Sequence, residues 1–373
     1  MEPTVVINAT SIGARFDGIG AYGIHLLRAL GAARSELRLT AVLGEAARRR
    51  FGPEGPPPGI DVRWVGGEVA PDRGTRGHLR RWMHAQVLAL RHRRNLVFCL
   101  SQIEAPLWGG PRIVTVHDAI PLLFKQDHPR QYHYYRRFLG RALRSAAAVI
   151  TPSEATRSLL RSIYGLPEEK LHVIPHGPTV PPRNGKPASP VKRPYVLCIA
   201  HASPTKNLDA LVDAFGRITD RIREDLVIAG TGLDRSSLAA LQGGNGVGTR
   251  VVIRPNVSEQ EKIELLDGAT VFVYPSLAEG FGLPPLEAMA RGLPIVTARS
   301  GALSEVCAGA PVYVDPCDSP GMAAALYALL NDEGERRRMA ARSRERVQAF
   351  SWYASARRHL ELFRRILGSS RSS

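Results

Sequence analysis

Short apolar runs alternate with amphipathic helical patterns along the whole chain. The runs are rich in β-branched residues and are typical of buried strands; they lie at Thr4–Asn8, Leu39–Leu43, Ile60–Val65, Leu96–Leu100, Arg112–Val116, Ala147–Thr151, Leu171–Ile174, Tyr195–Ala200, Leu226–Gly230, Arg250–Ile253, Thr270–Tyr274, Pro294–Thr297 and Pro311–Val314. Between them apolar side chains recur at helical spacing, as in Gly20–Gly31. The alternation predicts an α/β fold whose parallel sheets are covered on both faces by helices.

One segment interrupts this alternation. Residues Gly177–Pro194 are rich in proline and glycine and show no periodicity, which predicts a linker at 179–194. The 373 residues exceed the roughly 250–300 at which a single core stops growing. We therefore expect two doubly wound, Rossmann-like domains, residues 1–178 and 195–351. Their carboxyl-terminal strand ends would face each other across a ligand-binding cleft.

The last pattern, Ser351–Leu367, carries aromatic and aliphatic residues among arginines. It predicts an amphipathic helix over about 352–373 that joins the first domain. Such a terminal helix usually packs on its own protein, and the alternative is a helix that lies on a membrane surface.

The composition indicates a folded protein that acts in the cytoplasm. Apolar residues make up 44% of the chain, and no apolar run approaches the ~18 residues of a membrane-spanning helix. The opening MEPTVVINATS lacks the basic and apolar stretches of a secretory signal. The four cysteines are scattered without CxxC pairs, which argues against structural zinc and disulfides.

The formal charge of +16 needs a partner or a structural reason. Nucleic acid, an anionic membrane face and phosphorylated substrates are the candidate partners, and solvated helix faces are the alternative. No nucleic-acid-binding motif accompanies the charge, so no nucleic-acid partner is expected. The stretch Arg130–Arg137 (RQYHYYRR) mixes aromatic and cationic side chains, which suits a sugar or a lipid pyrophosphate at an anionic leaflet.

The most informative stretch is Tyr274–Thr297, YPSLAEGFGLPPLEAMARGLPIVT. An apolar strand leads into a glycine-rich loop and then into a helix whose first turn holds Pro284 and Pro285. Free N–H groups and the positive end of the helix dipole would meet there, which predicts an anion site. Two carboxylates bracket it, Glu279 in the loop and Glu287 in the first helical turn. Since a carboxylate repels phosphate, both are expected to accept hydrogen bonds from sugar hydroxyls, although Glu287 by itself also fits a helix-start carboxylate.

The stretch EGFGLPPLE resembles the Glu-x7-Glu signature of retaining GT-B glycosyltransferases of family 4, and the resemblance covers nearly the whole chain. INATSIGARFDGIGAYGIHLLRAL resembles the family's glycine-rich first loop, TVHDAIPLLF its His-Asp segment and ITPSEATRSLL its Ser-Glu segment. VIPHG resembles the interdomain crossing, and SPTKNLDALVDAF the segment that supplies a phosphate-binding lysine.

The resemblance implies a role for each matching residue. Glu287 would hold the donor ribose and Glu279 would face the transferred sugar, while Lys206 would neutralise the leaving diphosphate. His117, at a strand end in the first domain, would reach the reacting sugar. Backbone would contact the donor at the remaining positions. The loop with Gly18 and Gly20 would approach the diphosphate or the acceptor, and Asn256 and Val257 would lie at the nucleobase. The amides of Gly280, Phe281, Gly282 and Leu283 would bind the sugar hydroxyls and the diphosphate.

Two departures from the family pattern stand out. The family pairs its lysine with an arginine just before it or five positions earlier, where this chain has Thr205 and His201. The diphosphate clamp is therefore weaker, or completed by another arginine or by protonated His201. The segment Arg254–Val257, which would hold the nucleobase, also lacks the family's common glycine, so uracil and guanine stay open.

No metal and no other cofactor is expected, because the chain contains no Asp-x-Asp pair to hold a divalent ion. Lys206, loop amides and a helix N-terminus can do the same electrostatic work. The resemblance implies retention at the anomeric carbon by front-face attack. It also implies transfer of a hexose, with GDP-mannose mildly preferred to UDP-sugars, to a saccharide of lipopolysaccharide or exopolysaccharide synthesis. A lipid-linked acceptor at the inner membrane face would make the protein peripheral.

The sequence leaves other functions open. Within the same reaction, a soluble natural product such as an aminocyclitol is the alternative acceptor. A degenerate, catalytically weak scaffold subunit is the non-enzymatic alternative, because of Thr205 and His201. A dehydrogenase is disfavoured, since Ala9–Gly13 does not provide the GxGxxG that should follow the first strand. The linkage position and the oligomeric state are not encoded in any recognisable motif.

Overall fold

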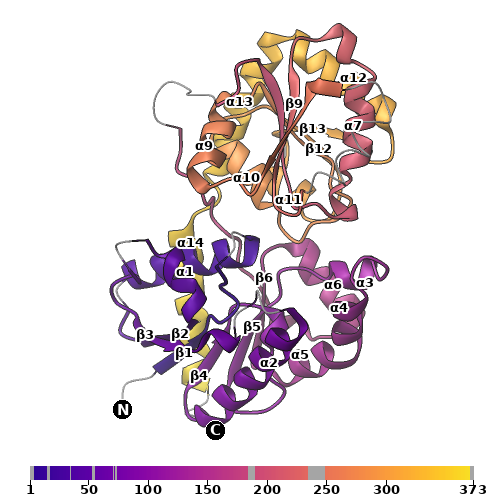
Figure 1. Cartoon of the computed structure of the whole chain (residues 1–373). Coiled ribbons are helices and arrows are strands. Elements are labelled where there is room, and N and C mark those ends of the chain that lie inside the picture. Colours follow the sequence, from indigo (N-terminus) through magenta and orange to yellow (C-terminus); the bar gives the residue numbers. More distant parts are fainter. Residues whose placement is uncertain are drawn as a thin grey trace. The chain divides into compact units, whose positions relative to one another are not determined.

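The computed structural model describes residues 4–14, 17–33, 35–52, 55–69, 71, 74–183, 190–233 and 248–369. The chain divides into two compact units (Figure 1). The first contains Met1–Thr179 and Phe350–Ser373, and the second contains Val180–Ala349.

Among the described residues, seven parallel strands form the sheet of the first unit, in the order β3-β2-β1-β4-β5-β6-β7. The strands are β1 (Thr4–Asn8), β2 (Arg38–Gly44), β3 (Asp61–Val65), β4 (Leu96–Cys99), β5 (Arg112–Thr115), β6 (Ala148–Thr151) and β7 (Leu171–Val173). Strand β1 lies inside the sheet, with β2 and β3 on one side of it and β4 to β7 on the other. The order therefore reverses between β1 and β4, which is where doubly wound sheets bind ligands.

The sheet of the second unit repeats this topology with the order β10-β9-β8-β11-β12-β13. Its described strands are β8 (Tyr195–Ile199), β9 (Asp225–Gly230), β10 (Val251–Pro255), β11 (Val271–Tyr274), β12 (Ile295–Ala298) and β13 (Val312–Val314). Here the order reverses between β8 and β11. Each strand expected from an apolar run is present within two residues, and both sheets are parallel, so the expected α/β fold is confirmed.

Helices cover both faces of the first sheet (Figure 1). Val5 and Ile7 pack in a cluster with α1 and α14, whereas Val6 between them packs in a cluster with α2 and α5, as the two-residue period of a strand requires. The described α-helices of this unit are α1 (Gly18–Ala32), α2 (Gly74–Arg91), α3 (Ile120–Leu123), α4 (Pro129–Tyr134), α5 (Gly140–Ser145), α6 (Glu154–Tyr164) and α14 (Trp352–Ser369). A π-helical segment, Tyr135–Leu139, joins α4 to α5, and short 3₁₀ turns occupy Glu45–Arg50, Gly67–Val69, Gln102–Glu104 and Glu168–Lys170.

The second unit follows the same plan. Its described α-helices are α7 (Leu208–Gly216), α9 (Glu259–Gly268), α10 (Leu283–Ala290), α11 (Leu303–Cys307), α12 (Ser319–Asn331) and α13 (Glu333–Val347). Short 3₁₀ turns occupy Pro204–Lys206, Thr219–Arg221 and Gly248–Arg250. The turn at Pro204–Lys206 lies in the segment that follows β8.

The carboxyl-terminal helix α14 packs on the first unit. Leu360 and Phe363 are buried, and the Phe363 ring centre lies 5.1 Å from that of Phe98 on β4. The apolar side of the terminal helix therefore faces the first unit. Residues 370–373 of the expected helix lie outside the described residues.

The glycine-rich segment before α1 corrects an expectation from the sequence. Gly18 and Gly20 do not form a loop; they are the first and third residues of α1, whose N-cap is Asp17. The Asp17 side chain accepts a hydrogen bond from the Gly20 amide at 2.6 Å. The cap satisfies one of the free N–H groups of the first turn, and helical order therefore begins at Gly18.

The start of the expected linker belongs to the second unit. The carbonyls of Pro181 and Pro182 accept hydrogen bonds from Arg291 at 2.7 and 3.0 Å. Residues 184–189 of the expected linker lie outside the described residues.

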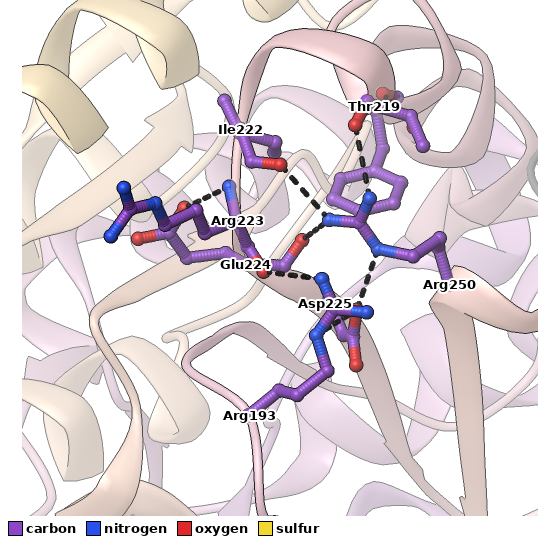
Figure 2. A network of polar contacts seen from close by, with 8 residues as sticks. Arg193, Thr219, Ile222, Arg223, Glu224, Asp225 and Arg250 are labelled. Carbon is purple, nitrogen blue, oxygen red and sulfur yellow. Dashed lines mark hydrogen bonds and ion pairs between the residues drawn. The ribbon is translucent and has the colours of Figure 1, made fainter.

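Several arginines form hydrogen bonds and ion pairs within the units. Arg250 pairs with Asp225 at 2.7 Å and donates to the carbonyls of Thr219, Ile222 and Glu224 (Figure 2). Asp225 begins β9 and Arg250 directly precedes β10, so this network ties the amino-terminal strand ends together. Arg112, Arg291, Arg336 and Arg346 likewise donate to backbone carbonyls. Part of the basic excess is therefore explained by carbonyl capping.

Cys99, Cys198 and Cys307 are buried thiols, and Cys317 is exposed. In the part of the chain that the structure describes, no helix has the length and apolar character needed to cross a bilayer.

Acidification is expected to destabilise the first unit. His359 is fully buried, and burial lowers its pKa from 6.5 to about 4. Between pH 6.5 and 4 the unfolded chain therefore binds a proton that the folded chain does not, and stability falls as the pH falls. The loss for this histidine is on the order of 3 kcal/mol by pH 4.

Urea unfolding between pH 7 and pH 4.5 measures this effect. All four tryptophans lie in the first unit, so their fluorescence reports on its unfolding. His359→Gln should show a shallower loss of stability with acid than the unchanged chain. An identical slope in both proteins would assign the acid sensitivity to other groups.

Candidate active site

The best-formed candidate site lies in the second unit, at the carboxyl ends of β8 and β11. These two strands are neighbours at the point where the strand order reverses. Lys206 ends the turn that follows β8, and Glu279 lies in the loop that follows β11. The sheet topology therefore brings together two residues that are 73 positions apart.

Lys206, Glu279 and Tyr274 form a compact charged cluster. Lys206 Nζ donates to Glu279 Oε1, and Tyr274 Oη donates to the same oxygen at 2.8 Å. The Lys206 and Glu279 side chains are only 15% and 10% exposed. Burial, reinforced by the Glu279 carboxylate, raises the pKa of Tyr274 well above its usual value of 10, so the phenol stays a donor. The sequence prediction missed Tyr274, because a tyrosine at a strand end has no distinctive spacing.

Hydrogen bonds between neighbouring loops fix this cluster. The Thr205 carbonyl accepts from the Leu277 amide at 2.8 Å and from Ser276 Oγ at 3.0 Å. The Glu279 carbonyl accepts from the Ala302 amide at 3.1 Å. Hydrogen bonds to the backbone carbonyls of Thr205, next to Lys206, and of Glu279 itself thus hold the two catalytic candidates in place.

Thr205 and His201 occupy the positions where the sequence suggested that an arginine is missing. Thr205 is 2% exposed and acts through its carbonyl in the contacts just described. His201 is exposed, and its Nδ1 lies 3.0 Å from Thr231 Oγ1.

The glycine loop enters α10 through a left-handed residue. Gly282 has φ of +99°, a backbone conformation that favours glycine. A Cβ there would also lie 2.6 Å from Leu303 Cδ2, at the end of that side chain. The next turn contains Pro284 and Pro285, which have no N–H. Among the described residues, the amides of Gly282 and Leu283 donate to no protein group. They remain available to an anion or a hydroxyl at this helix end.

Glu287 lies one turn further into α10 than expected. The helix begins at Leu283, so Glu287 is its fifth residue and not part of the first turn. The carboxylate is 6% exposed and accepts a hydrogen bond from Lys262 Nζ at 2.9 Å. An ion pair with Lys262, and not the helix dipole, therefore holds it.

The sequence prediction also missed Lys262. Its ammonium, on α9, contacts both Glu287 and Glu259, at 2.9 and 2.8 Å. Burial alone would lower the pKa of Lys262, but the two carboxylates outweigh burial and raise it. The signal that was available is that Lys262 is the one basic residue in the α9 sequence EQEKIELLDG.

Asn256 explains the missing glycine of the Arg254–Val257 segment. Its φ is +54°, a left-handed conformation that asparagine tolerates better than most residues. Its amide donates to the Gly230 carbonyl at 2.6 Å. Asn256 thus performs the backbone role of a glycine, and Val257 follows it directly after β10.

In the first unit, His117 lies just after the end of β5, as expected. Its Nε2–H donates to the Leu100 carbonyl at 2.8 Å, and burial lowers its pKa to about 4. The imidazole is therefore neutral at pH 7, with Nδ1 as its acceptor atom. Its ring contacts Tyr22 and His176, at centroid distances of 4.7 and 5.6 Å.

A buried ion pair lies at the carboxyl end of β4 in the same unit. Glu104 is fully buried, and Arg81 Nε is 3.8 Å from its carboxylate. Burial raises the pKa of Glu104 to about 7 despite this arginine. The sequence prediction did not single out Glu104.

No group of three or more His, Cys, Asp and Glu side chains is arranged to hold a metal ion in the described ranges. The roles of His117, Lys206, Glu279 and Glu287, and of the donor-binding backbone, stay predictions.

Gly301 supports the loop that carries Glu279. Its φ is +51°, and an added Cβ would lie 2.5 Å from the Glu279 carbonyl oxygen. Gly301→Ala is expected to destabilise the second unit by about 1–3 kcal/mol and to displace Glu279. Gly309→Ala is the matched control, because nothing lies within 4 Å of a Cβ there. Melting temperature and transfer rate measure the effect; equal values for the two variants would contradict it.

Two sequence profiles match the chain one after the other. Glycosyltransferase Family 4 matches residues 16–178, and Glycosyl transferases group 1 matches residues 183–346.

Curated relatives include enzymes with different acceptors. The chain is 30% identical to an MMP α-(1→4)-mannosyltransferase of Mycolicibacterium hassiacum, over 69% of this chain and 66% of that protein. It is 26% identical to the O-antigen chain mannosyltransferase B of Escherichia coli, over 90% and 92%. It is 31% identical to a D-inositol 3-phosphate glycosyltransferase of Kineococcus radiotolerans, over 71% and 68%.

Solved structures show the same fold. Sucrose-phosphate synthase from Thermosynechococcus elongatus superposes with a TM-score of 0.78 at 20% identity, covering 99% of this chain and 100% of that one. HepE of Anabaena, in complex with UDP and glucose, superposes with a TM-score of 0.73 at 17% identity, covering 97% and 99%. The two-sheet α/β architecture is therefore the GT-B fold.

Proposed function

The chain belongs to the family 4, group 1 glycosyltransferases, and on this premise we propose that it is a metal-independent, retaining hexosyltransferase that uses a nucleoside-diphosphate sugar. The observation that carries this proposal is the Lys206–Glu279–Tyr274 cluster at the carboxyl end of the second sheet. Its Glu279 lies in the same loop as Gly282, which leads into α10.

Each group has a role in the proposed reaction. Lys206 and the loop amides neutralise the charge that builds on the departing diphosphate. Glu279 accepts hydrogen bonds from the transferred sugar, and Glu287 accepts them from the ribose. The neutral His117 offers Nδ1 to a hydroxyl of the reacting sugar. Asn256 and Val257, after β10, contribute backbone to the nucleobase site.

The bond changes follow a front-face displacement. The bond from the anomeric carbon to the diphosphate oxygen breaks, and a bond to the acceptor oxygen forms on the same face. The acceptor proton passes to the departing phosphate oxygen. NMR of the product tests this course, because an inverted anomer would rule out retention.

GDP-mannose is the proposed donor, with UDP-sugars as the alternative. Two of the relatives described above are named mannosyltransferases, which supports mannose. A thermal-shift panel of UDP, GDP, ADP and their sugar derivatives, with and without EDTA, tests both the nucleobase and metal independence. A ligand at 100 times its Kd stabilises the native state by about 2.7 kcal/mol. We expect one nucleotide to raise the melting temperature regardless of EDTA.

Loss of that shift on adding EDTA would contradict metal independence. No shift with any nucleotide would favour a catalytically weak scaffold subunit, since Thr205 and His201 would then have cost the site its donor.

For the acceptor we propose a lipid-linked saccharide of lipopolysaccharide or exopolysaccharide synthesis, reached from the cytoplasm by peripheral contact with the inner membrane. The match to an O-antigen chain mannosyltransferase over most of both chains supports it. The match to D-inositol 3-phosphate glycosyltransferases favours a second candidate, a small soluble acceptor such as a phosphorylated cyclitol. Turnover with lipid-linked and soluble acceptors, measured side by side, decides between them.

A further inference from the structure

Helix α2 of the first unit has an unusual outer face. Nine large apolar residues are exposed in the described part of the chain, and four of them lie on this helix. They are Leu79, Met83, Val87 and Leu90, which are 56%, 55%, 43% and 37% exposed. Their spacing of four, four and three residues places them on one stripe along the helix. The opposite face, with Ala85, Leu88 and Ala89, is buried against the first unit.

Arginines border this stripe at both ends. Arg76 and Arg80 are exposed near its start, where Arg80 lies 3.4 Å from Glu68 of the preceding turn, and Arg91, Arg93 and Arg94 are exposed near its end. No Asp or Glu occurs between Gly74 and Ile103. Arg81 lies on the inner side of the helix, where it faces the buried Glu104. An exposed apolar stripe bordered by cations is the arrangement of a helix that lies in a membrane interface.

We infer that α2 docks the enzyme on an anionic lipid surface, with Leu79, Met83, Val87 and Leu90 inserted and the bordering arginines against lipid phosphates. This inference deepens the proposed peripheral membrane contact and rests on it. It places the contact on α2, whereas the sequence pointed to the terminal helix and to Arg130–Arg137.

Charge complementarity selects a membrane over a second copy of the chain. In a symmetric dimer through this stripe, the arginines of one helix would face those of the other, and α2 carries no acidic residue to compensate. An anionic leaflet attracts the same arginines.

Neighbouring elements share this character. The ring centres of His78 on α2 and Tyr134 on α4 are 5.8 Å apart, so α4 packs beside the start of α2. The π-helical segment and α5, which follow α4, line a cavity of about 630 Å³ together with Ile163. Its lining includes Phe138 and four arginines, Arg136, Arg137, Arg141 and Arg144.

The terminal helix α14 provides the contrast. It is also basic and amphipathic, but Leu360, Leu362, Phe363 and Leu367 on its apolar side are buried. Of its large apolar side chains only Tyr353 is exposed among the described residues. Helix α14 therefore presents arginines to solvent without an exposed apolar stripe.

Vesicle flotation of the full chain, without donor or acceptor, tests the inference. We expect binding to phosphatidylcholine vesicles that contain about a third phosphatidylglycerol, little binding to pure phosphatidylcholine, and weakening as salt is raised. The triple variant Leu79→Ser, Met83→Ser, Val87→Ser should bind at least tenfold more weakly. Arg76→Glu, Arg91→Glu, Arg94→Glu should do the same.

The matched control carries the same charge change on α14, as Arg357→Glu, Arg358→Glu, Arg364→Glu. It should lose less than about threefold. Equal loss in the α2 and α14 charge variants would overturn the inference in favour of net charge alone, as would an unchanged apolar variant. Each variant must keep the melting temperature of the parent protein; if one does not, the labelling below decides.

A label on α2 locates the contact without changing charge. Met83→Cys in a Cys317→Ser background offers one exposed thiol, since the other three cysteines are buried. An environment-sensitive dye there should shift to the blue on anionic vesicles, and the same dye on Tyr353→Cys should not. No shift at position 83, or dimer formation abolished by the apolar variant without vesicle binding, would overturn the inference. None of these readouts uses turnover or nucleotide, so a failed donor assignment and a failed docking surface are distinguishable.

Discussion

Lys206→Met is expected to lower kcat about 10²–10³-fold, the effect of removing one preorganised group that stabilises transition-state charge. Lys206 is the ammonium placed between β8 and the glycine loop, where the diphosphate would leave. A methionine keeps the unbranched apolar stem of the side chain and removes the ammonium, with its charge and its N–H donors. Single-turnover rates with saturating donor measure the chemical step separately from binding.

Stability and catalysis can be separated at this pair. Removing Lys206 leaves the nearly buried Glu279 carboxylate with Tyr274 as its remaining donor, which destabilises the second unit. The double variant Lys206→Met, Glu279→Gln restores neutrality, so we expect it to regain melting temperature but not activity. If activity returned together with stability, Lys206 would be a structural partner of Glu279 and not a catalytic residue.

Glu287→Gln is expected to weaken nucleoside-diphosphate binding about 10–100-fold, since a hydrogen bond to a charged group contributes about 1.5–3 kcal/mol. The proposed role is specific to the ribose. The unchanged enzyme should therefore discriminate against 2′-deoxy and 3′-deoxy nucleotides, and the variant should not. Isothermal titration with matched ribo- and deoxynucleotides measures both quantities. A variant that keeps the full discrimination would exclude Glu287 from the ribose site.

Lys262 extends this prediction to a positioning residue. Lys262→Met leaves Glu287 without its ammonium partner, so we expect nucleotide binding to weaken about tenfold. Glu259→Gln is the control, because Glu259 is 41% exposed and contacts Lys262 from the solvent side; it should change binding less than about twofold. A lower melting temperature in Lys262→Met with unchanged nucleotide affinity would limit Lys262 to a structural role.

The two ion pairs share one arrangement. Lys206–Glu279 and Lys262–Glu287 each set a cation against one of the two glutamates of the EGFGLPPLE motif. Each ion pair thereby orients its carboxylate before any substrate arrives. An oriented acceptor is more useful to a sugar hydroxyl than a mobile one, since less freedom is lost on binding.

The sequence by itself determined the fold, because buried parallel strands are apolar throughout and stand out from the helices between them. In the described part of the chain the thirteen runs became thirteen strands. Every residue of the inner strands β4, β5, β6, β8, β11 and β12 is buried. The sequence also predicted the glycine loop and Glu279, since a strand, glycines and prolines follow one another there within a few residues. The family followed from the same local motifs.

Only the tertiary structure decided which partners those residues have. Lys262 is 25 positions from Glu287, and Lys206 is 73 positions from Glu279, so no local spacing announces either pair. The sequence misjudged Gly18, Gly20 and Glu287 by single turns, because a helix start depends on its cap. It also drew attention to the basic terminal helix, whose apolar side is covered, while the exposed stripe lies on α2. Amphipathic pattern alone cannot say whether the apolar face meets the protein's own sheet or faces outward, because burial depends on which elements pack together.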